Sequence, residues 1–152
     1  LDAADLTATM AADANLAGAS LVGARLERAD FSRATLSNAN LTGADLTSAL
    51  FASASMQSAV LTGSICHDTN LSDAQLTSAQ LNQADLTMCN LSGAKLGRAN
   101  LSGANLTSAI LEGATLKAAN MTASILRDVN LSGCQLVSAQ LGKADLTRAN
   151  LT

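Results

Sequence analysis

The sequence predicts an all-β solenoid, in which the chain winds into stacked square coils. Three regularities indicate this fold. Leucine recurs at every fifth residue, alanine recurs two residues before it, and small polar residues follow it. A side-chain period of five suits neither a helix nor a flat strand, so the chain has to turn once in each repeat.

The leucine position, called position i, fixes the frame of the repeat. It holds Leu at 25 of its 31 places, and the others are Ala11, Phe31, Phe51, Met56, Cys66 and Met121. On an α-helix, steps of five residues advance about 500°, so the leucines would scatter around the axis. On a flat strand, every second leucine would face water. Both structures are therefore excluded.

The other positions of the repeat predict one short side and one corner. Position i−2 is Ala in 23 of 30 repeats and points inward with position i, as alternate residues of a short strand do. Position i−1 is Asp or Asn in 14 of 30 repeats, and position i+1 is Ser or Thr in 16 of 31. Position i+2 favours Gly, Ser, Asp and Asn, which are turn residues. Four repeats close a square, so Leu81 stacks on Leu101, and 152 residues give about 7.6 coils of 20 residues.

This A-[DN]-L-x-x pattern resembles that of the pentapeptide-repeat family over essentially the whole chain. The resemblance implies a right-handed quadrilateral parallel β-helix, with positions i and i−2 inside. We expect a single domain over residues 1–152 with no visible caps. Uncapped coils present unpaired backbone groups, so we expect either flanking segments outside this sequence, which we favour, or end-to-end stacking.

The composition favours no catalytic, cofactor or metal site. Cys66, Cys89 and Cys134 occupy inward positions without metal-ligand or redox spacing, and His67 is a lone outward histidine. A convex rod predicts no cleft, so we expect no enzyme activity, no cofactor and no small-molecule substrate. The net charge of −3 argues against a nucleic-acid ligand, and the lack of an 18-residue apolar run argues against membrane insertion.

The outward position i−1 gives the candidate site. Six repeats place a bulky apolar residue there: Met10, Leu50, Val60, Ile65, Ile110 and Ile125. Leu50 and Ile110 share one side of the coil, and Ile65 and Ile125 share the adjacent side. Grouped exposed apolar residues mark interfaces, so these residues predict a docking strip for a protein partner. The alternative is that each one only shields the layer below it.

The sequence predicts a non-enzymatic, rigid scaffold for protein–protein interaction. The resemblance implies a cyanobacterial or plastid setting, with the thylakoid lumen or the cytoplasm as the compartment. It also implies a DNA-mimic regulator of a type II topoisomerase as an alternative, because some relatives inhibit or protect gyrase. This chain differs from that branch in its leucine axis, its small net charge and its lack of a C-terminal dimerisation segment. A second alternative is a repeat domain of a larger membrane-linked or effector protein.

Overall fold

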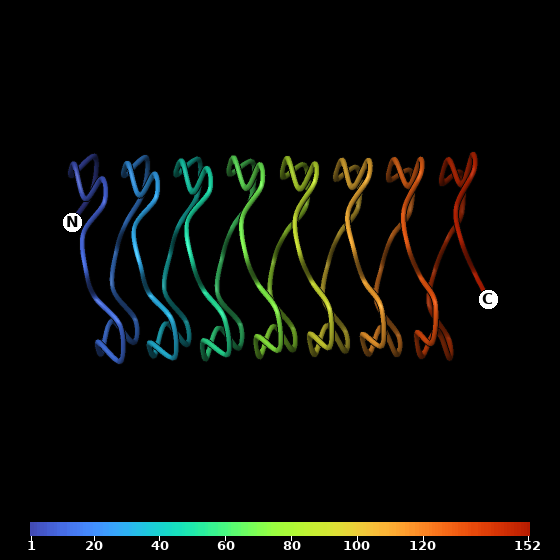
Figure 1. The fold of residues 1–152 in the computed structure, drawn as a ribbon, viewed down its shortest axis with the longest axis horizontal. Coiled ribbons are helices and arrows are strands. Elements are labelled where there is room, and N and C mark those ends of the chain that lie inside the picture. The colour runs from blue at the N-terminus through green and yellow to red at the C-terminus, as the bar shows by residue number, and fades with distance from the viewer.

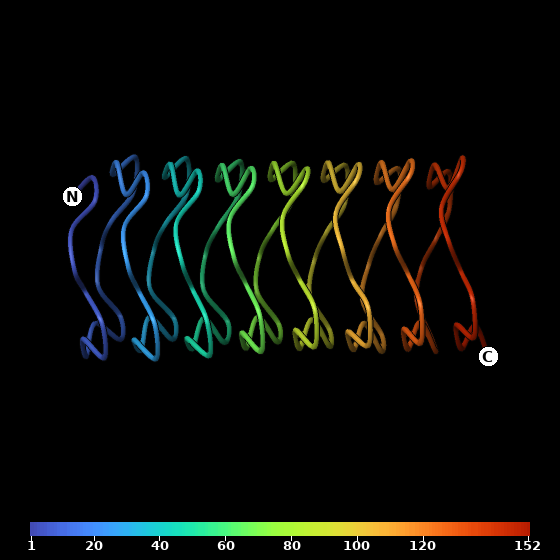
Figure 2. The same cartoon turned by 90° about the horizontal axis from the view of Figure 1, so that it is seen from above.

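The chain forms a straight rod of stacked coils, described by a computed structural model that covers residues 1–152. Figures 1 and 2 show coil following coil along a single axis, with the two termini at opposite ends of the rod. There is no helix, and no strand extends beyond an isolated bridge residue. Accordingly, the structure contains no helix able to cross a bilayer.

Each coil contains 20 residues, as the sequence predicts. Position i−1 forms a parallel bridge with the residue 20 positions further on, as Asp85 does with Asn105. Such bridges run from Asp5–Arg25 to Asn130–Asn150 and define four sides per coil. The predicted short strand across Ala-x-Leu is reduced to this one bridge residue, because positions i+1 and i+2 already belong to the turn.

Four of the five backbone N–H groups in a repeat bond to backbone carbonyls. The N–H at position i donates to the next coil, as Leu86 does to Asn105 at 2.7 Å, and the N–H at i+2 does the same. The N–H at i+3 closes the turn, as Cys89 does to the Leu86 carbonyl at 3.1 Å, and the N–H at i−1 reaches the preceding coil. Only the N–H at i+1, here that of Thr87, lacks a backbone acceptor.

Every corner has the same backbone conformation, whatever residue occupies it. Position i+2 has a positive φ throughout, from 52° at Ala3 to 67° at Gly18, and most of these residues are not glycine. A positive φ at the third residue of a four-residue turn defines a type II turn. Bulky residues such as Met88 and Arg98 therefore adopt a left-handed conformation that costs them energy, and the stacked coils hold them in it.

The core is a continuous column of leucine and alanine side chains. It contains 42 buried residues, and the rings of Phe31 and Phe51 stack within it with centroids 5.3 Å apart and planes 10° apart. The inward hydroxyls of Ser64, Thr69 and Ser124 each donate a hydrogen bond to a backbone carbonyl at 2.8 Å. Burying these polar groups is tolerated because each has a partner.

Candidate functional site

The rod has four sides, named here by the residues of the first coil and their counterparts every 20 residues. Face A starts at residues 5–8, face B at 10–13, face C at 15–18 and face D at 20–23. Faces A and B adjoin each other, and faces C and D adjoin each other. Each face presents the side chains at i−1 and i+1, and the residue at i+2 forms its far corner.

The structure gathers five of the six predicted docking residues on two adjacent faces. Ile65 and Ile125 lie on face A, and Met10, Leu50 and Ile110 lie on face B, whereas Val60 lies apart on face D. The exposed fraction is 42% for Leu50, 43% for Ile65, 41% for Ile110 and 82% for Met10. Val60 and Ile125 are half-buried. Their role in docking stays a prediction.

Sequence reasoning missed one apolar residue on these faces. Met88 is 53% exposed and stands at the corner of face A. It occupies position i+2, where polar turn residues were expected, and its φ of 59° points its side chain away from the core. A bulky residue in a corner position was the signal that could have identified it.

Faces A and B carry every acidic residue of the chain except Asp2. Residues 34–94 contain no Lys or Arg, and Asp45, Asp68, Asp73 and Asp85 form no ion pair, although Asp45 lies next to Arg25 in the stacked column of face A. Ile65 lies between Asp45 and Asp85 in the stacked column of face A. The middle of the rod therefore presents aliphatic side chains within a negative surface.

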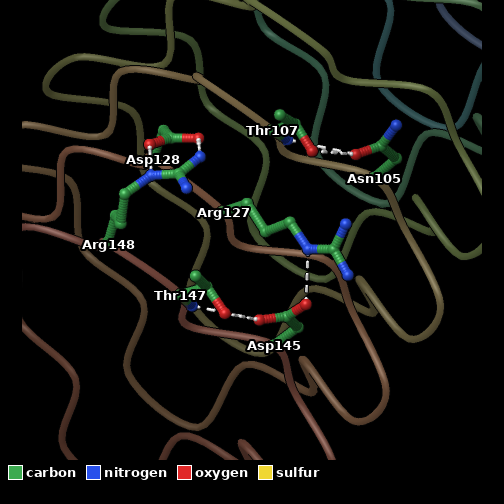
Figure 3. Close-up of polar contacts among 7 residues, drawn as sticks. All are labelled: Asn105, Thr107, Arg127, Asp128, Asp145, Thr147 and Arg148. Carbon is green, nitrogen blue, oxygen red and sulfur yellow. Dashed lines mark hydrogen bonds and ion pairs between the residues drawn. The ribbon is translucent and has the colours of Figure 1, made fainter.

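Ion pairs neutralise the acidic faces only towards the ends of the rod. Figure 3 shows one such group, in which the Arg148 guanidinium donates to both carboxylate oxygens of Asp128, at 2.5 and 2.6 Å. Nearby, Arg127 Nε donates to Asp145 Oδ2 at 2.5 Å. The pKa of the Asp145 carboxyl falls from its ordinary 3.8 to about 2, because the Thr147 hydroxyl, the Arg127 guanidinium and the Thr147 N–H all donate to its charged form.

The three cysteines are free thiols, two of them buried and Cys134 half-buried. Burial raises the pKa of the Cys66 thiol to about 12 and raises the pKa of Cys89 as well. Thiols with such raised pKa values are poor nucleophiles and poor metal ligands. No group of three or more His, Cys, Asp or Glu side chains is arranged to hold a metal ion.

The orphan N–H at position i+1 explains the preference for Asp or Asn at i−1. In all 14 repeats with Asp or Asn there, Oδ1 accepts this N–H; Figure 3 shows it for Asn105 with Thr107, at 3.1 Å. Asp and Asn are suited to this role because their side chains reach the backbone two residues ahead. A repeat without them leaves an outward donor without an acceptor, unless another side chain reaches it.

Face C is the one side on which such donors follow one another in an unbroken series. Its i−1 positions beyond Asn15 hold no Asp or Asn, and the N–H groups at i+1 accordingly have no acceptor within the protein. We call these groups the N–H ladder; it comprises the N–H groups of Ser37, Gln57, Thr77, Gly97, Lys117 and Val137. Stacked coils place its members about 4.8 Å apart.

A hollow of about 290 Å³ interrupts the surface in the middle of this ladder, lined by Thr77, Gly97, Arg98, Thr115, Lys117 and Ala118. The sequence predicted no cleft on a convex rod, and the hollow corrects that expectation. It exists because Gly97 presents no side chain between the Thr77 and Lys117 side chains of the neighbouring coils. The signal was a glycine at i+1, outside the corner position where the fold uses glycine.

Comparisons with known proteins place this geometry in a family. The chain matches the family described as "Pentapeptide repeats (8 copies)" over residues 1–38, 12–47, 49–93, 89–122 and 116–152. A comparison with curated protein sequences gave no significant match.

Solved structures share the coil. HetL, a pentapeptide repeat protein involved in regulating heterocyst differentiation in the cyanobacterium Nostoc sp. strain PCC 7120, is 34% identical with a TM-score of 0.64; the alignment covers 95% of this chain and 75% of HetL. Trypsin-treated QnrB1 (R167E), a plasmid-mediated fluoroquinolone resistance protein, is 19% identical with a TM-score of 0.75, over 97% of this chain and 77% of that one. A thylakoid-lumen pentapeptide repeat protein from Arabidopsis thaliana is 29% identical with a TM-score of 0.44, over 76% and 66% of the two chains.

The likeness to QnrB1, at less than a fifth of residues identical, concerns the fold alone. The match to HetL combines fold and sequence over nearly the whole chain. Together with the repeat matches from residue 1 to residue 152, it confirms the right-handed quadrilateral β-helix. The chain belongs to the pentapeptide-repeat family.

Proposed function

We propose that the protein is a non-enzymatic scaffold that binds a protein partner through faces A and B. The observation that carries this proposal is the set of exposed aliphatic side chains within a negative surface. Leu50, Ile65 and Ile110 remain more than 40% exposed although each lies in a stacked column of the rod. Exposed apolar side chains within a polar surround are typical of interfaces.

The charge of these faces defines the chemistry of the partner. Asp45 and Asp85 flank Ile65 on face A, and no Lys or Arg lies between residues 34 and 94. A complementary partner presents an apolar contact surrounded by Lys or Arg side chains. Opposite charges around such a contact speed association and discriminate against wrong partners more than they add affinity.

Regulation of a topoisomerase by DNA mimicry has less support. A DNA mimic needs continuous negative charge along the rod, and Arg25, Arg33, Arg127 and Arg148 pair with carboxylates on these faces. The one long stretch with several carboxylates and no Lys or Arg is residues 34–94, in the middle of the rod. This distribution favours a local protein contact over a surface that copies a DNA duplex.

The test is affinity capture from an extract of the source organism, read by mass spectrometry. The native rod is compared with a variant carrying Leu50→Asn, Ile65→Asn, Ile110→Asn and Ile125→Asn. Asn at i−1 is the residue that caps the i+1 N–H elsewhere, so this variant should fold. The matched control carries Val60→Asn and Val137→Asn, which remove apolar side chains from faces D and C.

We expect a partner held by the native rod and by the control, and lost from the four-site variant. A second variant, Asp45→Asn with Asp85→Asn, keeps both side-chain caps but removes two charges, so it should hold the same partner more weakly. Identical captures by the native rod and the four-site variant would contradict the proposal.

A further inference from the structure

We propose that face C binds an acidic segment of a partner protein, with an aspartate or glutamate carboxylate seated in the hollow at Gly97. This site lies on the side of the rod opposite face A and is independent of the function proposed above. Three observations support it: the N–H ladder, unpaired cations, and side-chain carboxylate and carboxamide oxygens that already accept equivalent N–H groups elsewhere in the molecule.

The hollow concentrates hydrogen-bond donors that have no acceptor in the protein. The N–H groups of Thr77, Gly97 and Lys117 point outward from three successive coils without a partner. The hydroxyls of Thr77 and Thr115 at its rim likewise form no hydrogen bond within the protein. Because backbone N–H groups bond strongly to ionised acceptors, a carboxylate is the chemistry that satisfies this set.

The charges on face C favour an anion. Lys95, Arg98 and Lys117 lie on this face, and none of them forms an ion pair within the protein. Face C carries no Asp or Glu. The cations are therefore available to an incoming carboxylate, and no neighbouring acid on the same face repels it.

The molecule itself shows how carboxamide and carboxylate oxygens of side chains accept an N–H of this kind. On the same face, Asn15 Oδ1 accepts the Ala17 N–H at 3.1 Å. On face D, Asp2 Oδ1 accepts the Val22 N–H at 3.1 Å across the gap between two coils. The second case shows that the acceptor can come from outside the repeat that carries the donor.

Gly97 opens the site without being required by the backbone. Its φ is not positive, and a Cβ added there would lie 3.8 Å from the Lys117 carbonyl oxygen, an ordinary contact. Elsewhere in the rod, the groups that accept the equivalent i+1 N–H are carboxylate and carboxamide side chains of the polypeptide. The hollow also opens on a convex surface, where a segment gains contacts beside the carboxylate that a free acid cannot. These points favour a side chain of a peptide.

The test follows the backbone N–H signals of Thr77, Gly97 and Lys117 by NMR during titration with an acetylated, amidated Glu-Glu-Asp-Glu peptide. Succinate and inorganic phosphate are the comparison ligands. The variant is Lys95→Asn, whose side chain should cap the Gly97 N–H as Asn15 caps that of Ala17. Its matched control is Lys95→Gln, which removes the same charge but has no such cap, as at Gln75.

We expect the peptide to shift these signals saturably. We expect Lys95→Asn to weaken binding about tenfold more than Lys95→Gln does, because the introduced Asn occupies the Gly97 N–H that would otherwise bond to the peptide carboxylate. The dispersion of the remaining signals reports that each variant is folded. Absence of saturable shifts, or equal weakening by both variants, would overturn the carboxylate site. Binding of succinate as tight as that of the peptide, or binding of phosphate alone, would overturn the assignment to an acidic segment.

Discussion

At the residue scale, the Asp or Asn at position i−1 links the composition of the repeat to the stability of the coil. Of the five N–H groups in a repeat, it caps the one that has no backbone acceptor, as Asn105 does for Thr107. The same side chain accepts the Thr107 hydroxyl at 2.7 Å. The preference for these residues therefore has a structural cause that is separate from solubility.

Removing such a cap should be measurable. Asn105→Ala should lower the free energy of unfolding by about 1 kcal/mol, the typical net value for lost hydrogen bonds of this kind. Thr35→Ala is the control, because the Thr35 side chain forms no hydrogen bond at the same repeat position, and should change stability by less than about 0.5 kcal/mol. Urea denaturation checks both, and equal losses would show that the cap contributes nothing.

At the scale of the coil, stability comes from layers that cover one another. Leu86 is fully buried between two coils, whereas Leu146 in the last coil is half-buried. Stability in such an array is close to a sum over neighbouring layers. The same leucine should therefore contribute different amounts at different places along the rod.

Leu86→Ala should destabilise the protein by about 2–5 kcal/mol, because the layers above and below prevent the cavity from collapsing. Leu146→Ala should cost clearly less, since its side chain already touches water. Thermal and urea denaturation followed by circular dichroism compare the two. A loss at Leu146 as large as that at Leu86 would mean that the coils do not behave as separate layers.

At the scale of the whole molecule, the charge distribution predicts a response to acid. The pKa values of Asp13, Asp128 and Asp145 are lowered in the folded state by hydrogen bonds from arginine or threonine side chains. A carboxyl with a lowered folded pKa stabilises the protein fully above its unfolded pKa, here 3.8, and loses that contribution as the pH falls towards about 2.

We therefore expect the urea concentration at the unfolding midpoint to stay constant from neutral pH to about pH 4, and to decrease as the pH is lowered further. Asp145→Asn keeps an acceptor for the Thr147 N–H but cannot titrate, so its midpoint should fall less steeply between pH 4 and pH 2. If the midpoint of this variant decreased between pH 4 and pH 2 as steeply as that of the native protein, Asp145 would not contribute to the loss of stability in acid.

The sequence was sufficient for the fold, because a leucine period of five leaves the chain little choice but to turn once per repeat. It did not show that residues as bulky as Met88 and Arg98 adopt positive φ, since stacking imposes that conformation against local preference. Nor did it show the N–H ladder, which is invisible one repeat at a time. Arranging the i−1 residues in columns of 20 would have revealed that the i−1 column of face C holds no Asp or Asn from Thr35 to Gln135. Predicting the hollow would also have required a second step. Gly97 matters because it has no side chain, and not because a turn needs a glycine at that position.

The 20-residue stacking has a consequence for how such rods diverge. Duplicating one five-residue unit would leave every leucine inside, yet it would rotate all later residues by a quarter turn and transfer, for instance, the cations of face C to face D. Duplicating four units together would lengthen each face and keep its chemistry in line. Two residues therefore lie on the same face only when their separation in the sequence is close to a multiple of 20. An insertion that leaves the core unchanged can still separate the residues of a binding surface.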